Sequence, residues 1–142
     1  MRKQLLYEYA VIRVVPRVER EEFINAGLVL FCKEKNILSC RIHLDEGKLC
    51  CLDPNMDVGW IEENLKAFED IALGRNEKSK ISAWDLPSRF RWLTATRSTI
   101  IQSSKVHIGF SEDLESSFER LFQQLVATPI AQEKKLHPEG NT

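Results

Sequence analysis

The side chains best suited to bind a ligand lie early in the chain. Arg13 stands in an apolar run that begins at Leu5, and Asn25 and Gly27 interrupt the next apolar run. Glycine inside a strand indicates a bulge or a close backbone approach. Asparagine is also disfavoured in strands, so its side chain is expected to have a hydrogen-bonding role. Glu22 lies between the two runs, and we expect it to pair with Arg13 across the fold.

This polar cluster admits two interpretations. Arg13, Glu22 and Asn25 would fix the order of the strands if they form a buried network. The same groups, with Gly27, would form a binding site if a ligand or a partner reaches them. Both interpretations stay open at the level of the sequence.

A second group of candidates lies in the basic stretch at residues 75–105. It contains seven Lys and Arg residues against two acidic ones. Arginine forks suit phosphates and aromatic faces stack on bases, and here Phe90 and Trp92 alternate with arginines. The alternative is a solvated basic surface whose aromatic residues belong to the core. The binding residues predicted in this stretch are Arg89, Arg91 and Arg97.

Metal and catalytic signatures are weak. The cysteines at positions 32, 40, 50 and 51 lack the close pairing of zinc ligands. We expect free thiols, buried or half-buried, and no metal or cofactor. The chain also has no G-x-S-x-G elbow, phosphate loop or glycine-rich dinucleotide turn. These features favour a protein without catalytic activity.

Length and composition indicate one globular domain. The chain has 142 residues, of which 43% are hydrophobic and 29% charged, enough apolar surface for a core. We expect a single domain at residues 1–130 and a disordered tail at 131–142. The formal net charge of −1 means that any nucleic-acid role rests on a local patch.

No targeting or membrane segment is expected. Glu8 interrupts the few apolar residues near the N-terminus, whereas a signal peptide needs an apolar stretch of about 7–15 residues. No run of about 18 apolar residues occurs. The sequence therefore predicts a cytoplasmic protein that does not enter a membrane.

The pattern of strands predicts an α+β fold. Strand-like runs cover residues 5–15, 24–32 and 37–44, and the last two form a hairpin around the polar turn at 33–36. Residues 99–110 indicate one strand or a broken pair. Because strands come early and helices late, we expect a largely antiparallel sheet, with the N-terminal strand and hairpin packed against a middle and a C-terminal helix.

Two helices are predicted from apolar periodicity. The middle one is expected to start at Asp53–Pro54 and end at Gly74. The C-terminal one is expected to be capped by Ser111 and ended by Thr128–Pro129. Residues 87–93 are ambiguous between a short helix and a loop. The expected buried face of the middle helix consists of Ile61, Leu65, Phe68 and Ala72.

The polar cluster carries a family resemblance. An aromatic-x-x-x-Arg pattern ends at Arg13, and Glu-Phe-x-Asn-x-Gly-x-x-x-Phe runs from Glu22 to Phe31. These motifs, with Arg-Phe-x-Trp-Leu from Arg89, resemble the bacterial DUF3037 family of unknown function. The resemblance implies a bacterial source and places the family's polar positions on Arg13, Glu22, Asn25 and Gly27. It brings no activity, but suggests a gene neighbourhood with HipA-type kinases.

We therefore expect a non-enzymatic interaction domain that docks on a protein partner, for which the resemblance suggests a HipA-type kinase. The alternative is binding of nucleic acid or a phosphate ligand through residues 75–105. An enzyme acting at Arg13 and Glu22 is a third option. The sequence leaves the oligomeric state open.

Overall fold

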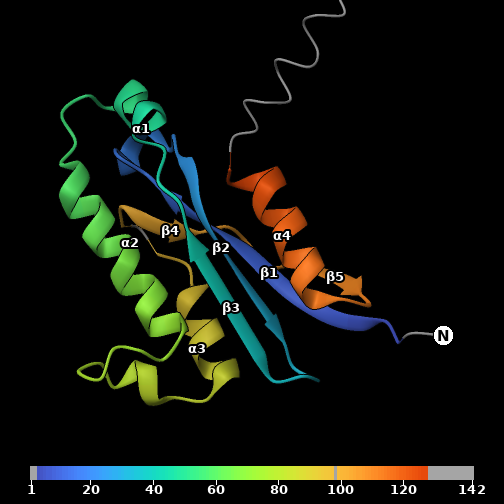
Figure 1. The fold of residues 1–142 in the computed structure, drawn as a ribbon. Coiled ribbons are helices and arrows are strands. Elements are labelled where there is room, and N and C mark those ends of the chain that lie inside the picture. Colours follow the sequence, from blue (N-terminus) through green and yellow to red (C-terminus); the bar gives the residue numbers. More distant parts are fainter. Residues whose placement is uncertain (1–2, 98, 128–142) are drawn as a thin grey trace, which may run out of the picture.

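The computed structural model describes residues 3–97 and 99–127. It is an α+β fold in which one antiparallel sheet lies between helices on both faces (Figure 1). The tail expected at 131–142 and the helix stop expected at Thr128–Pro129 lie outside the described residues.

The first strand is the centre of the sheet. It pairs with β2 along one side, and with both β4 and β5 along the other, so the order is β3-β2-β1 followed by β4 and β5 in one line. Residues 99–110 thus form the broken pair rather than one strand. The strands are β1 (Leu5–Val14), β2 (Ile24–Cys32), β3 (Ile37–Ile42), β4 (Ile101–Ser103) and β5 (His107–Ser111).

The predicted hairpin is confirmed. β2 and β3 pair antiparallel from Gly27 opposite Ile42 to Cys32 opposite Ile37. The turn between them closes with the backbone N–H of Asn36 donating to the carbonyl of Lys33 at 3.1 Å. Asn36 has a φ of 54°, a left-handed conformation that asparagine tolerates better than most residues.

Three helices cover one face of the sheet. They are α1 (Glu46–Leu52), α2 (Val58–Ala72) and α3 (Leu86–Leu93). The predicted start of the middle helix at Asp53 was wrong, because Asp53 is the C-cap of α1 and α2 begins after Asp57. The carboxylate of Asp57 accepts the N–H of Trp60 at 3.1 Å and so caps α2. The predicted buried face of Ile61, Leu65, Phe68 and Ala72 is confirmed.

A single helix, α4 (Leu114–Leu125), covers the other face. The predicted cap at Ser111 was wrong, because Ser111 is still the last residue of β5. Asp113 caps the helix instead, and its carboxylate accepts the N–H of Ser116 at 3.4 Å. Ser111 is buried, and its hydroxyl accepts the N–H of Asp113 at 2.9 Å.

The sheet separates two hydrophobic cores. Side chains alternate across a strand, so Ile12 and Val14 of β1 face α2 while Leu5 and Tyr7 face α4. Among the described helices, none is both long and apolar enough to cross a membrane.

Candidate functional site

The first candidate segment contains a β-bulge. Ile12 lies opposite Gly27 but Arg13 lies opposite Asn25, so Ala26 is the extra residue in β2. A Cβ on Gly27 would lie 2.7 Å from Cδ1 of Ile42 and 3.0 Å from a backbone oxygen of β3. Both predicted reasons for a glycine, a bulge and a close approach, are therefore met at the same position.

Asn25 has the hydrogen-bonding role that its position in a strand indicated. Its side-chain Nδ2 donates to the carbonyl of Leu125 at 2.9 Å. Leu125 is the last residue of α4, where helical carbonyls have no partner within the helix. The side chain therefore ties β2 to the end of α4, which is a structural role.

The expected pair between Arg13 and Glu22 does not form. Glu22 accepts two hydrogen bonds from Arg20 instead, at 2.8 and 3.0 Å. The two residues are close in an exposed loop, where the arginine fork reaches the carboxylate and lowers the pKa of Glu22. Arg13 places its guanidinium 4.0 Å from the ring centre of Phe23.

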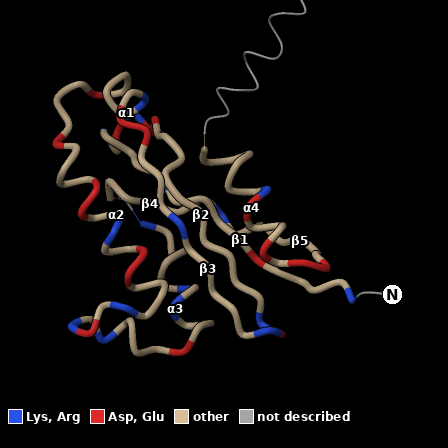
Figure 2. The backbone as a smooth tube through the Cα atoms, in the orientation of Figure 1, with Lys and Arg blue, Asp and Glu red and all other residues tan. Residues whose placement is uncertain are grey.

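The basic stretch does not form one surface. Nη1 of Arg89 donates to the carbonyl of Ser82 at 3.0 Å, whereas Arg91 is exposed. Arg75 pairs with Asp70 at the end of α2, at 3.4 Å. Figure 2 shows basic and acidic positions interspersed over the loop between α2 and α3. The structure therefore separates Arg89, Arg91 and Arg97 instead of gathering them.

Arg97 lies apart from the other two arginines and close to Arg13. Its guanidinium is 4.3 Å from the ring centre of Trp92, and it donates to the carbonyl of the same residue. Arg97 and Arg13 line a single cleft of about 290 Å³ at the end of the sheet. The sequence had assigned these two arginines to different sites.

Cysteines differ in exposure. Cys32 and Cys40 are buried, as expected, whereas Cys50 and Cys51 are exposed. The expectation was wrong for the second pair because α1 buries only Leu49. All four are free thiols, and within the described residues no group of three or more His, Cys, Asp or Glu is placed to hold a metal.

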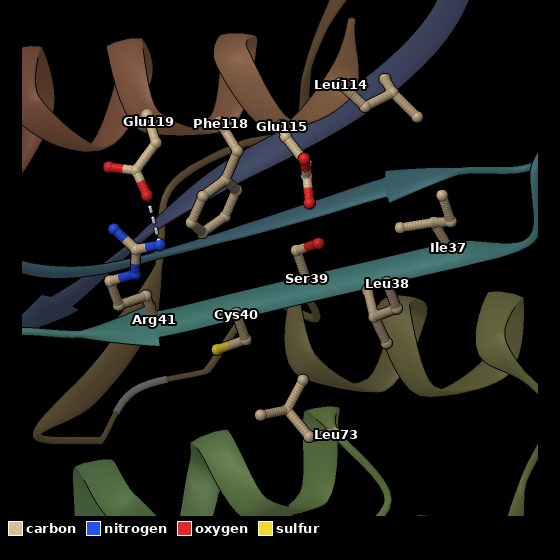
Figure 3. A pocket seen from close by; sticks show the side chains of 10 residues that line it. All are labelled: Ile37, Leu38, Ser39, Cys40, Arg41, Leu73, Leu114, Glu115, Phe118 and Glu119. Carbon is tan, nitrogen blue, oxygen red and sulfur yellow. Dashed lines mark hydrogen bonds and ion pairs between the residues drawn. The ribbon is translucent and has the colours of Figure 1, made fainter.

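A groove of about 550 Å³ runs along β3, the edge strand of the sheet. Figure 3 shows β3 in the middle, α4 along one side and Leu73, just after α2, on the other. Ile37, Ser39 and Arg41 point towards α4, and Leu38 and Cys40 point towards Leu73. The other lining residues come from α4 and are Leu114, Glu115, Phe118 and Glu119.

The outer edge of β3 carries unpaired backbone groups. The N–H of His43 donates to the carbonyl of Ala26 at 2.8 Å, which fixes the alternation of bonded pairs in this hairpin. In an antiparallel pair every second residue turns its N–H and C=O away from its neighbour. Here those residues are Leu38, Cys40 and Ile42, and no described strand lies beyond them.

The charges of the groove are unequal. Arg41 forms an ion pair with Glu119, and its guanidinium lies 5.1 Å from the ring centre of Phe118. Glu115 makes no ion pair with any described residue, and Figure 3 shows its carboxylate directed towards Ser39. Burial raises the pKa of the Cys40 thiol, so the thiol is neutral at pH 7. The free charge in the groove is therefore negative.

Sequence reasoning missed this groove. The available signal was the order of the strands: after the hairpin the chain passes into helices, so no neighbouring strand in sequence covers β3. The lining residues of α4 were identified only as a helix stripe, because their distance from β3 depends on the tertiary fold.

An apolar patch also remains uncovered. Leu6 of β1 lies opposite Phe110 of β5, and Ile108 lies opposite Glu8. Ile108 is 66% exposed and Phe110 62% exposed. The patch lies at the end of the sheet that α1, α2 and α3 leave open.

A protein-family model matches most of the chain. The match covers residues 9–126 and is to the model described as a protein of unknown function, DUF3037. The chain belongs to the DUF3037 family. The bulge, the cleft and the lining of the β3 groove of this DUF3037 member lie within the part that defines the family. No curated protein and no solved structure matches the chain.

Proposed function

We propose that this DUF3037 member is a non-enzymatic interaction domain that accepts an extended segment of a partner protein along β3. The observation that supports it is the open outer edge of β3, where Leu38, Cys40 and Ile42 present their backbone groups beside a groove. Unpaired N–H and C=O groups at a sheet edge are matched by another extended backbone, the mode known as strand addition.

The residues that line the groove indicate which side chains suit the added strand of the partner. Its side chains would point alternately towards α4 and towards Leu73, because successive residues of a strand face opposite sides. Phe118 and Leu73 offer apolar contacts on the two sides. Since Arg41 is paired and Glu115 is not, a basic side chain suits the positions that face α4.

The cellular setting is part of the same proposal. We infer a bacterial cytoplasmic protein, because exposed free thiols such as Cys50 and Cys51 suit a reducing compartment. A HipA-type kinase is the first partner to test, since the family resemblance suggests such a neighbour.

The test is an affinity capture of the tagged full chain from its host, with and without nuclease, read by mass spectrometry. Glu115→Lys reverses the free charge of the groove, and Leu73→Glu places a charge on its opposite wall. Glu62→Lys is the matched control, because Glu62 is an exposed residue of α2 that does not line the groove. We expect a protein partner that survives nuclease, is lost with both groove variants and is retained with the control.

Three results would contradict the proposal. A partner retained by both groove variants would place the interface elsewhere. Capture of a second copy of this chain, and of no other protein, would show that the interface serves self-association instead of a different partner protein. Recovery of nucleic acid, with its proteins lost after nuclease and binding that weakens steeply with salt, would favour the phosphate-binding alternative.

A further inference from the structure

Two arginines from distant parts of the chain meet in one cleft. Arg13 belongs to β1, and Arg97 follows α3. The cleft has a volume of about 290 Å³, and Phe23, Glu21 and Gln102 lie in its wall with them. It shares no lining residue with the β3 groove, so it is a separate site.

Arg13 lacks the partners that a half-buried arginine usually has. Its Nε is buried and has no hydrogen-bond partner, and the side chain makes no ion pair with any described residue. Buried donors are almost always satisfied, so an orphaned donor beside a cleft indicates a missing acceptor. The ring of Phe23, 4.0 Å from the guanidinium carbon, holds the group in place.

Arg97 is held by aromatic rings in the same way, and it too makes no ion pair with any described residue. The ring of Trp92 lies 4.3 Å from its guanidinium, and that of Phe68 lies 5.8 Å away. Its one described hydrogen bond goes to the carbonyl of Trp92, so most of its donors are unused. Burial lowers the pKa of Arg97.

The remaining polar groups leave the cleft positive. Glu21 is the one carboxylate among its lining residues, and it is exposed and pairs with no described residue. The amide nitrogen of Gln102 donates one of its two hydrogens to the carbonyl of Thr99 at 2.7 Å. Two guanidinium groups against one solvated carboxylate favour an anionic ligand.

We propose that the cleft binds a small oxyanion, a carboxylate or a phosphate, held between the guanidinium groups of Arg13 and Arg97. Arginine forks match the oxygen geometry of both groups with paired hydrogen bonds. Aromatic rings behind both guanidinium groups orient them before the ligand arrives, which reduces the entropy lost on binding. The volume admits the oxyanion with a few attached atoms, but not a large ligand.

The experiment is an NMR titration of the full chain with sodium phosphate and, separately, with sodium acetate, both at fixed ionic strength. The reporters are the Nε–H signals of Arg13 and Arg97 and the indole N–H of Trp92. We expect saturable shifts at millimolar concentration with at least one probe, and the probe that binds more tightly identifies the oxyanion class.

Variants connect the shifts to the cleft. Arg13→Gln and Arg97→Gln should each weaken binding about tenfold or more, as expected for loss of a charge-assisted pair. Glu21→Gln should tighten binding, because it removes the opposing charge. Arg91→Gln is the matched control, since Arg91 is exposed and does not line the cleft, and it should bind as the unsubstituted chain does.

The proposal is overturned if neither probe produces saturable shifts, or if Arg91→Gln weakens binding as much as Arg97→Gln does. Arg13→Lys keeps the charge and loses the fork, and it replaces Arg13→Gln if that variant fails to fold. Binding unchanged in Arg13→Lys and Arg97→Gln would also overturn the proposal.

Discussion

At the scale of single residues, Gly27 has almost no room for a side chain. Ala26 and Gly27 together oppose one residue of β1, and β3 passes close to Gly27 on the other side. We expect Gly27→Ala to lower the free energy of unfolding by about 1–3 kcal/mol, the usual cost of overpacking. Urea unfolding followed by circular dichroism measures this difference.

Gly59→Ala is the matched control. Gly59 lies in the first turn of α2, and the nearest atom to an added Cβ is 3.6 Å away. Alanine is favoured over glycine in helices, so this variant should be as stable as the unsubstituted chain or more stable, by up to about 1 kcal/mol. Equal stability of the two variants would contradict the close approach at Gly27.

Asn25 gives a second prediction. Asn25→Ala removes the hydrogen bond to Leu125 and leaves a carbonyl at the end of α4 without that donor. We expect a loss of about 1 kcal/mol in the free energy of unfolding. Asn64→Ala is the control, because the amide of Asn64 also donates to a backbone carbonyl, that of Trp60, but in an exposed position within α2.

The comparison tests the structural role of Asn25. A structural role predicts a larger loss for Asn25→Ala than for Asn64→Ala in the same unfolding measurement. Should the two variants lose the same amount, the contact with α4 contributes nothing beyond an ordinary surface hydrogen bond.

At this scale the sequence could show which residues are unusual for a strand, but not which groups they contact. A glycine and an asparagine inside an apolar strand violate local preference, so their special roles were predictable. The surroundings of Arg13 were not predictable, because a turn separates it from Phe23 and most of the chain separates it from Arg97. Local patterns favoured Glu22, which instead found Arg20 two residues away.

At the scale of elements, apolar spacing predicted the helix faces better than their ends. The buried face of α2 depends on four side chains that repeat at helical spacing, and the structure has all four. The start of α2 was harder to predict, because Asp53 and Asp57 are both residues that can precede a helix. Asp57 caps the start of α2, whereas Asp53 caps the end of α1. The short α1 was missed because it buries one residue, which is too few to produce a periodic pattern.

The strand β3 supports a prediction about alkaline pH. Burial raises the pKa of the Cys40 thiol above that of an unfolded cysteine, which is about 8.5. The unfolded chain therefore loses this proton before the folded chain does. The stability that the neutral thiol contributes is complete below the unfolded pKa and decreases as the pH rises above it.

We expect the free energy of unfolding to fall between neutral pH and about pH 10, and to fall less in Cys40→Ala. Urea titrations at both pH values measure the difference. Cys50→Ala is the control, because it removes a thiol that is exposed instead of buried. An unaltered alkaline loss in Cys40→Ala would show that Cys40 is not the group responsible.

At the scale of the whole molecule, the sheet divides the fold into two unequal halves. Three helices and the larger core lie on one face, and α4 with a smaller core lies on the other. The α+β class and the antiparallel sheet were predictable because strands precede helices without alternation. The sequence could not predict that the middle and C-terminal helices cover opposite faces of the sheet. Each helix has one apolar stripe, and the stripe is the same whichever face the helix covers.

The position of β1 also determines when the fold can be completed during synthesis. Leu5 pairs with Ser111, so β1 receives one of its neighbours only after β2, β3 and the helices α1, α2 and α3 have been made. Until then Leu5 and Tyr7 also lack α4, which follows β5. The nascent chain therefore presents an apolar strand with an open edge until β5 and α4 have been made, the kind of segment that chaperones bind.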